Sequence, residues 1–581
     1  MTLLPDPFRY ISSSRLHTIY WILTIFLSAI GIGVMYCTLF GNGTLSLIVI
    51  IISALTDSLV LFLPLIFLKK KFKWIVPFWF MFLSLLELSN IIYFRNFHDC
   101  ISGISYLSSG SINKFVIKSA AASIRWVDAL FIVNPLIIFA ITLVIPALQK
   151  TSRKFQILYI ALTFILLSSQ IALSIRRIGI YKQLNDTENI LTEYSKGFNQ
   201  QTCWKYYVLH YGFTGYLIRV VRDFRGAKHI LSDNEKIRVD EFWHKRSQPT
   251  PICMEKNDSI FNLNREKNLI FIVVESLNSK IFTLPDSHII APNLNSLIED
   301  TTTLSFLNVL PQTRHGRSSD GQFIYNTGML PLRDEALISR YADANYPSLA
   351  KIINRRSAIE VIGEDRSLWN HSITSRSYGY ANLIDNVTTH DTPIAQRDSL
   401  IFSRAAVEIS KIESSFFIFI TTIGMHEPYN QATGIALPLS GKYDHRDLHY
   451  LESVHAFDKS LGQFIRFLKK WGLYDNSVII IAADHEESPP QLSNLFSEKK
   501  IPVIILNSGL TASQPDTTPQ YQVNVFPSIL DIMGISTNGG YRGVGKSMMR
   551  NNTSISGEEM EEMWDISELS IRGKYFPFSQ L

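Results

Sequence analysis

Long apolar stretches dominate the first third of the chain, and shorter ones that alternate with polar residues follow in the rest. Five of the long stretches can each cross a bilayer as a helix, which takes about 20 residues. They cover residues 18–40, 44–68, 74–94, 126–148 and 155–175. The first is too long for the apolar core of a signal peptide, and no small-residue cleavage site follows it. The pattern predicts a membrane domain with five transmembrane helices over residues 1–176.

Basic residues cluster in three of the segments that flank these helices, and they predict the topology. The clusters are Arg9 with Arg15, then Lys69, Lys70, Lys71 and Lys73, and finally Lys150, Arg153 and Lys154. Lys and Arg concentrate on the cytoplasmic side of membrane proteins, so the N-terminus is expected in the cytoplasm. Five crossings then place the rest of the chain outside. We expect a multi-pass membrane protein whose second domain is extracytoplasmic.

Residues 177–262, which follow the last predicted span, mix aromatic and basic residues and are expected to form a juxtamembrane helical linker. Their part 204–224 has apolar residues at helical spacing, with Trp and Tyr among Arg and Lys. Such helices lie on membrane surfaces, although helices packed on a soluble domain give the same pattern.

Acids within the predicted spans either line a lipid or acceptor groove or hydrogen-bond neighbouring helices. These acids are Asp57, Glu87 and Asp128.

From residue 268 onward, short apolar strands alternate with helical patterns. Strands are predicted at 269–274, 358–362, 415–421, 477–482 and 502–506, and helices at 292–300, 346–355, 400–412 and 446–471. This alternation is typical of an α/β domain with a mainly parallel central sheet. We expect this domain over residues 263–581, with ligands collected at the carboxyl ends of its strands.

Composition and charge add limits on partners. A chain of 581 residues exceeds one ordinary core, which agrees with two domains. The basic clusters beside the membrane helices supply much of the positive charge behind the net value of +5. No basic stripe with interleaved aromatic residues is present, so nucleic acid is not an expected partner. Cys203 and Cys253 fall in the exported part, and their spacing leaves open whether they pair or stay as thiols.

Metal-ligand residues directly follow two of the predicted strands. Glu275 ends the apolar run in NLIFIVVES, and Asp484 and His485 end the run in NSVIIIAADH. Between them, the polar loop QTRHGRSSDG offers the hydroxyl groups of Ser318 and Ser319. Taken singly, such residues are more often helix caps or solvated groups. Together they are the parts of a metal-activated nucleophile, and the oxygen and nitrogen ligands suit Zn²⁺ or Mn²⁺.

Several segments carry a resemblance to a known family. They are VVESLNS (273–279), PNLNSL (292–297), GRSSD (316–320), NTGMLPL (326–332), TTIGMHEPY (421–429), WGLYDNSVIIIAADH (471–485), VNVFPSILDIMGI (523–535) and ELSNIIYFRNF (87–97). The chain resembles the lipoteichoic acid synthase and phosphoglycerol transferase branch of the alkaline phosphatase/sulfatase superfamily, to which phosphoethanolamine transferases are more distantly related. The resemblance covers nearly the whole chain. It implies five membrane helices in the bacterial inner (cytoplasmic) membrane, with the N-terminus in the cytoplasm, followed by a periplasmic or extracellular sulfatase-like domain.

The resemblance also implies roles for individual residues. Glu275, Ser318, Asp484 and His485 correspond to the metal ligands of the family, and Ser318 corresponds to its nucleophile. The family usually has Thr at this position, and Ser keeps the hydroxyl group. Ser319 is a rival nucleophile.

Further residues are implied in binding the substrate. His426 would contact the substrate and protonate the leaving alcohol, while Arg317 and Trp369 would bind the headgroup. His371 stands where the family has Arg, and this change weakens a bidentate phosphate contact. The run EESPPQ after His485 departs from the family as well. Both departures concern the headgroup rather than the chemistry.

We therefore expect a metal-dependent phosphotransferase. It would take a phosphoglycerol group from phosphatidylglycerol, or a phosphoethanolamine group from phosphatidylethanolamine, and pass it through a covalent Ser318 intermediate to an extracytoplasmic glycan or lipid acceptor. The alternatives are a sulfatase or phosphodiesterase hydrolase, an inactive membrane sensor and a transporter. Neither Ser318 nor Ser319 has the Pro and Arg context of classical sulfatases, and the spans show no paired halves typical of transporters.

Overall fold

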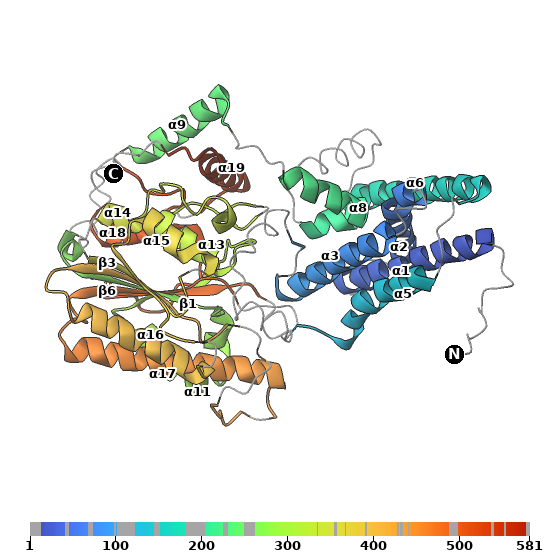
Figure 1. The fold of residues 1–581 in the computed structure, drawn as a ribbon. Helices are drawn as coiled ribbons and strands as arrows, with labels where there is room; N and C mark the ends of the chain where they lie inside the picture. The colour runs from blue at the N-terminus through green and yellow to red at the C-terminus, as the bar shows by residue number, and fades with distance from the viewer. Residues whose placement is uncertain are drawn as a thin grey trace. The chain divides into compact units, whose positions relative to one another are not determined.

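The computed structural model describes residues 13–40, 46–67, 74–97, 100–101, 123–144, 151–181, 204–224, 230–248, 262–333, 335–353, 357–366, 368–389, 392–426, 429, 434–439, 441–486, 498–535, 540–550 and 554–576. The chain divides into two compact units (Figure 1). Most of the chain up to Gly226 forms a membrane unit, and an α/β unit begins at Ala227.

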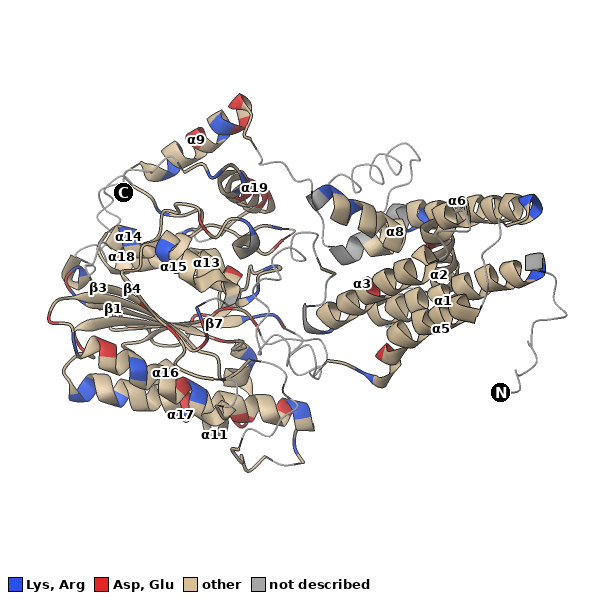
Figure 2. Cartoon of the chain, viewed as in Figure 1, with Lys and Arg blue, Asp and Glu red and all other residues tan. Residues whose placement is uncertain are grey.

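Five apolar helices form the membrane unit, which confirms the prediction from the hydrophobic pattern. They are α1 (Ser13–Phe40), α2 (Leu47–Phe62) extended by η1 (Leu63–Phe67), α3 (Ile75–Phe97), α5 (Leu130–Val144) preceded by η4 (Trp126–Ala129), and α6 (Arg153–Tyr181). Each contains a window of mean hydropathy between 1.8 and 2.4. Charged side chains are sparse along these helices (Figure 2). Most of the basic clusters that predict the topology, namely Arg9, Lys69, Lys70, Lys71, Lys73 and Lys150, lie outside the described residues.

A further helix, α8 (Trp204–Phe224), packs against α2 and α6 of the membrane unit. It breaks at Gly212, whose φ of 74° lies in the left-handed region that glycine adopts without strain. After the break, the backbone N–H groups of Phe213 and Thr214 donate to the carboxylate of Asp57, each at 3.0 Å. A helix N-terminus stabilises a carboxylate in this way. A buried acid of α2 therefore anchors α8 to the membrane unit.

The other two acids of the membrane helices differ in their surroundings. Asp128 forms a bidentate ion pair with Arg95, at 2.6 and 2.8 Å. Glu87 is fully buried, and neither of its carboxylate oxygens has a hydrogen-bond partner among the described residues. Asp57 and Asp128 thus serve contacts within the membrane unit, which is one of the two roles expected for these acids.

An eight-stranded sheet forms the centre of the α/β unit, in the order β4-β3-β5-β1-β6-β7-β2-β8. The strands are β1 (Asn268–Val274), β2 (Leu304–Leu310), β3 (Ser357–Ile362), β4 (Asn382–Ile384), β5 (Phe416–Thr421), β6 (Ser477–Ala483), β7 (Ile501–Leu506) and β8 (Gln520–Tyr521). Strands β4, β3, β5, β1 and β6 run parallel, and β7 is antiparallel to both of its neighbours. This confirms the predicted α/β class with a mainly parallel sheet.

The central strand β1 lies between β5 and β6, and every residue of all three strands is buried. Helices cover both faces of a parallel sheet, and for that reason its strands have uninterrupted apolar sequences. Figure 1 shows α16 (Ile394–Ile409) and α17 (His445–Lys470) on one face. On the other face lie α13 (Ser318–Thr327), α14 (Leu349–Ile353), α15 (His371–Tyr378) and α18 (Val525–Ile532).

The expected linker 177–262 contributes a helix to each unit. Whereas α8 packs in the membrane unit, α9 (Asp233–Ser247) packs against the C-terminal helix α19 (Gly557–Gly573) of the α/β unit. The indole N–H of Trp243 in α9 donates to Oγ of Ser570 in α19 at 3.1 Å. Cys203 and Cys253 lie outside the described residues, so their pairing stays open.

Candidate metal centre

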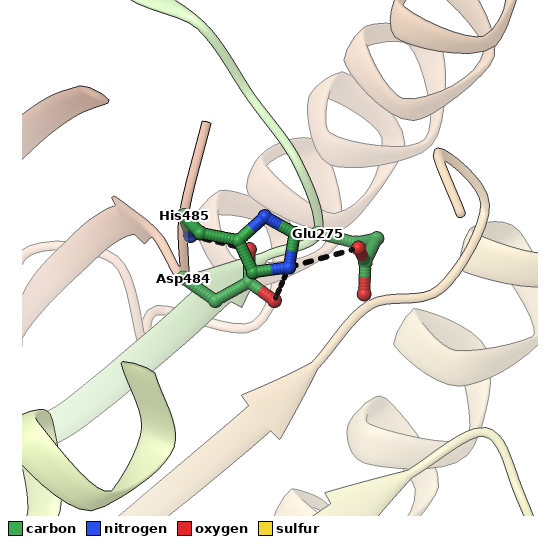
Figure 3. A group of neighbouring side chains, drawn as sticks. All are labelled: Glu275, Asp484 and His485. Carbon is green, nitrogen blue, oxygen red and sulfur yellow. Dashed lines mark hydrogen bonds and ion pairs between the residues drawn. The ribbon is translucent and has the colours of Figure 1, made fainter. Parts of the chain in front are cut away.

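Two adjacent strands bring the predicted carboxylate ligands together. The last residues of β1 and β6, Val274 and Ala483, are paired in register. Glu275 and Asp484 follow directly, and the N–H of Asp484 donates to the carbonyl oxygen of Val274 at 3.0 Å. With His485 they form a group whose ligand atoms all lie within 4.8 Å of one another (Figure 3). The sheet itself therefore sets the spacing of the group.

The distances within this group suit one small cation. Nε2 of His485 lies 3.5 Å from Oε1 of Glu275 and 3.5 Å from Oδ2 of Asp484. Oγ of Ser318 lies 3.1 Å from Nε2 of His485 and 3.2 Å from Oε2 of Glu275. Ligands bound tetrahedrally at about 2 Å from zinc are about 3.3 Å apart. The four side chains thus have the separations of a four-coordinate site.

The charges at the site also favour a cation. Glu275 and Asp484 are 5% and 0% exposed. Oδ2 of Asp484 has no hydrogen-bond partner among the described residues. Burial, and then the charge of Asp484, raises the pKa of Glu275 to about 8. Two buried carboxylates disfavour being charged together unless a positive ion offsets them.

The ring of His485 is oriented to bind through Nε2. Its Nδ1 lies 2.7 Å from the carbonyl oxygen of Glu486 and donates to it. A histidine that donates from one ring nitrogen to a carbonyl leaves the other nitrogen unprotonated and available to a metal. Arg317 places a positive charge beside the Nδ1 edge of the ring, because its Nη2 lies 3.3 Å from Nδ1 of His485.

Ser318 is the first residue of α13. Arg317 before it has φ 47° and ψ −114°, a strained conformation for a residue other than glycine. The Ser318 hydroxyl lies next to Glu275 and His485, at a helix N-terminus that favours an anionic phosphoryl group. Ser319 instead donates its hydroxyl to the carbonyl oxygen of Gly316 at 2.7 Å and is buried. This geometry favours Ser318 over Ser319 as the reacting hydroxyl.

The loop before α13 is held by Asp320, a residue for which the sequence predicted no role. Its Oδ2 accepts hydrogen bonds from the backbone N–H groups of Arg314 and Gly316, at 2.8 and 2.9 Å. Asp320 is fully buried, and this burial raises its pKa to about 6. A Cβ at position 316 would clash with Oδ1 of Asp320, so the loop requires glycine there. The only sequence signal for Asp320 was its place in the motif GRSSD.

His426, which lies beyond the end of β5, is linked to the centre through Glu364. This partly buried acid follows β3 and interacts electrostatically with both His426 and Glu275. Burial raises the pKa of Glu364, and His426 opposes that effect. No motif pointed to Glu364, because its importance depends on two residues that are distant in the chain.

The two remaining predicted substrate residues lie beyond β3. Trp369 has φ 49° and packs, partly buried, at the edge of the core. His371 is 5% exposed, and its Nδ1 lies 3.9 Å from Oε1 of Glu360 in β3. Burial lowers the pKa of His371 to about 4, so the ring is neutral near pH 7. A contact between His371 and the substrate stays a prediction. In the run after His485, residues 487–491 lie outside the described part.

Comparisons with known proteins account for both units. The model of the lipoteichoic acid synthase N-terminal domain matches residues 8–218, and the sulfatase model matches residues 267–535. Lipoteichoic acid synthase 2 of Bacillus subtilis is 24% identical over 525 residues, which are 85% of this chain and 77% of that protein. Lipoteichoic acid synthase of Staphylococcus aureus is 24% identical over 514 residues, 83% of this chain and 75% of that protein.

Among solved structures, the lipoteichoic acid synthase LtaP from Listeria monocytogenes is similar to 58% of this chain over 97% of its own length, with 17% identity and a TM-score of 0.45. The triad Glu275, Asp484 and His485 is a possible set of metal ligands in the described part of this chain. The two matched models, the apolar helices and the α/β sheet agree with one another. The chain combines a lipoteichoic acid synthase N-terminal domain with a sulfatase domain, and over more than four fifths of its length it is similar to lipoteichoic acid synthases.

Proposed function

We propose that this protein is a membrane-anchored phosphotransferase that moves a phosphoglycerol or phosphoethanolamine group from a phospholipid to an acceptor. The observation that carries this proposal is the position of the Ser318 hydroxyl, 3.2 Å from Glu275 and 3.1 Å from His485 at the start of α13. Five apolar helices in the same chain make a lipid the natural donor. The curated relatives are named lipoteichoic acid synthases.

The proposed topology has the N-terminus in the cytoplasm and the α/β unit outside. Arg15, Arg153 and Lys154 flank the first and fifth candidate spans on what would be the cytoplasmic side. The active site would then meet phospholipid headgroups of the outer leaflet. Phosphatidylglycerol and phosphatidylethanolamine are the proposed donors, and an extracytoplasmic glycan or lipid is the proposed acceptor.

In the first step, Ser318 loses its proton to solvent and its Oγ attacks the phosphorus of the lipid phosphodiester. The bond from phosphorus to the glycerol oxygen of the diacylglycerol breaks. His426 gives a proton to that oxygen, and diacylglycerol leaves as a neutral alcohol. The headgroup phosphate stays on Ser318 as a phosphodiester.

In the second step, a hydroxyl group of the acceptor gives its proton to His426 and attacks the same phosphorus. The bond between phosphorus and Oγ of Ser318 breaks, Oγ takes a proton back from solvent, and the acceptor carries away the headgroup phosphate. A covalent intermediate of this kind predicts ping-pong kinetics. Because His426 gives a proton in the first step and takes one in the second, it returns to its starting state.

The candidate ligands would hold one divalent ion, Zn²⁺ or Mn²⁺. Once bound, the ion would lower the pKa of the Ser318 hydroxyl and offset charge on the phosphoryl group. Arg317 adds a fixed positive charge beside His485. Trp369, Arg317 and His426 are the proposed contacts to the headgroup. His371 is a less direct candidate, because it is buried next to Glu360.

Intact-protein mass spectrometry tests this proposal. The full-length protein in detergent is loaded with Zn²⁺ or Mn²⁺ and incubated with phosphatidylglycerol or phosphatidylethanolamine. We expect a mass increase equal to one headgroup phosphate, located on the Ser318 peptide, and the added mass names the headgroup. Lipid consumption without any adduct would contradict the covalent route. Hydrolysis of sulfate esters in place of lipid turnover would support the sulfatase alternative.

A further inference from the structure

Ser276, which directly follows the candidate ligand Glu275, contacts both carboxylates of the metal centre. Its hydroxyl donates to Oε1 of Glu275 at 2.5 Å, and its backbone N–H donates to Oδ1 of Asp484 at 2.9 Å. Its φ of 53° lies in the left-handed region, which is costly for serine. Ser276 thus adopts a costly backbone conformation at the position where it bonds to both carboxylates.

Each of these two hydrogen bonds holds one oxygen of a carboxylate. Oε1 of Glu275 and Oδ1 of Asp484 are engaged by Ser276, and Oδ1 also accepts from the N–H of His485 at 2.7 Å. The second oxygen of each carboxylate faces another candidate ligand. Oε2 of Glu275 lies 3.2 Å from Oγ of Ser318, and Oδ2 of Asp484 lies 3.5 Å from Nε2 of His485. Oε1 of Glu275 also lies 3.5 Å from Nε2 of His485, so the oxygen that Ser276 holds borders the site as well. Ser276 therefore fixes the orientation in which both carboxylates face the site.

Ser276 is itself held by Tyr450 of α17, through its carbonyl oxygen. The hydroxyl of Tyr450 donates to the carbonyl oxygen of Ser276 at 2.8 Å and accepts from the N–H of Asn278 at 3.1 Å. The Tyr450 ring is fully buried and packs edge-on against Tyr429, at 5.1 Å between centroids. Tyr429 in turn donates its hydroxyl to the carbonyl oxygen of Met425. Two buried tyrosines, Tyr450 and Tyr429, thus connect the turn at Ser276 with the segment that carries His426.

We infer that Ser276 is a positioning residue that orients Glu275 and Asp484 for metal binding, and that Tyr450 supports it. Residues that orient metal ligands by hydrogen bonds typically change metal affinity about 10- to 100-fold when they are removed. The inference rests on the metal site of the proposed function, and it concerns how firmly that site holds its ion.

The test measures metal binding rather than turnover. Full-length protein in detergent is stripped with a chelator and titrated with Zn²⁺ and with Mn²⁺ by calorimetry. Ser276→Ala is expected to raise the dissociation constant about 10- to 100-fold. Tyr450→Phe is expected to have a smaller effect of the same sign, since it removes the bonds to the carbonyl oxygen of Ser276 and from the N–H of Asn278 but leaves the Ser276 hydroxyl in place. Ser276→Gly removes the hydroxyl without strain at positive φ. If the alanine variant folds poorly, the metal affinity of the glycine variant gives the same test.

Ser279 offers a matched control in the same loop. It is buried, and its hydroxyl has no hydrogen-bond partner among the described residues. Ser279→Ala should therefore bind metal like the parent protein. Equal affinity for the Ser276 and Ser279 variants would overturn the positioning role. If the parent protein bound neither ion, the metal site itself would be refuted, and that failure is distinct from the first.

Discussion

Oγ of Ser318 and Nε2 of His485 lie 3.1 Å apart, although 167 residues separate them in the sequence. We predict that Ser318→Ala abolishes the covalent adduct and lowers transfer by on the order of 10³-fold or more, as loss of a nucleophile does. Ser319→Ala should retain adduct formation, because the Ser319 hydroxyl only closes a loop onto Gly316. Mass spectrometry and lipid turnover of both variants check this. An adduct that survives in Ser318→Ala would rule out the assignment.

Metal should stabilise the fold as well as activate the serine. Glu275 and Asp484 are buried together, so an ion that binds only the folded protein adds stability. At a free concentration of 100 times its dissociation constant, the gain is about 2.7 kcal/mol. Thermal unfolding of chelated and reloaded protein measures it. Asp484→Asn should lose most of this metal-dependent shift, and an undiminished shift would place the ion elsewhere.

The carboxylate of Asp320 is predicted to act on Ser318 through the shape of the loop. Asp320→Asn retains an oxygen that can accept the N–H groups of Arg314 and Gly316, whereas Asp320→Ala leaves both without that acceptor. We expect near-normal adduct formation in the asparagine variant and a loss of at least about 10-fold in the alanine variant, from about 1–3 kcal/mol per unsatisfied group. Equal losses in both variants would instead indicate that the negative charge is required.

Stability should depend on pH through Glu360. Burial raises the pKa of Glu360 to about 7, so the folded protein favours the protonated acid. Its contribution to stability is fully present below about pH 4.5 and is lost as the pH rises through 7. Glu360→Gln removes this loss. We expect the variant to gain about 1–3 kcal/mol relative to the parent between pH 5 and pH 8. Chemical denaturation at both pH values tests it, with the exposed Glu413→Gln as a control that should show no such gain.

The anchor between α2 and α8 can be tested through backbone amides. Asp57→Ala removes the acceptor of the Thr214 N–H and leaves the N–H of Phe213 with the hydroxyl of Tyr36, at 3.1 Å, as its acceptor. We expect faster hydrogen exchange, most clearly at Thr214, since a lost partner costs about 1–3 kcal/mol. Thr56→Ala is the control, because the Thr56 hydroxyl bonds only within its own helix to Ile52. Unchanged exchange in Asp57→Ala would show that other contacts hold α8.

The sequence predicted best those helices and strands whose own apolar pattern is enough to identify them. The membrane helices and the strands β1, β5 and β6 consist of long apolar runs, and the structure confirms them. Strands β4 and β8 were missed because they contain only three and two residues, too few for a pattern. Strand β2 was missed because Ser305 and Asn308 interrupt its apolar run.

The candidate site was predictable to the same extent. Glu275, Asp484 and His485 stand at the ends of strong strands, so the hydrophobic pattern alone is enough to expect their proximity. Ser276 could not be assigned a role, since its partner Asp484 lies 208 residues away and the contact depends on a left-handed turn. The position of His371 was also beyond the sequence, because only the fold places it beside Glu360.

The pairing of β1 with β6 has a consequence for how such proteins diversify. Backbone hydrogen bonds between neighbouring strands fix a spacing of about 4.8 Å that no side-chain substitution alters. Glu275 and Asp484 inherit that spacing, whereas the proposed headgroup contacts Trp369 and His426 stand on loops beyond other strands. Mutational libraries confined to those loops should therefore yield new donor preferences while the reactive centre stays intact, so the chemistry can persist through repeated changes of substrate.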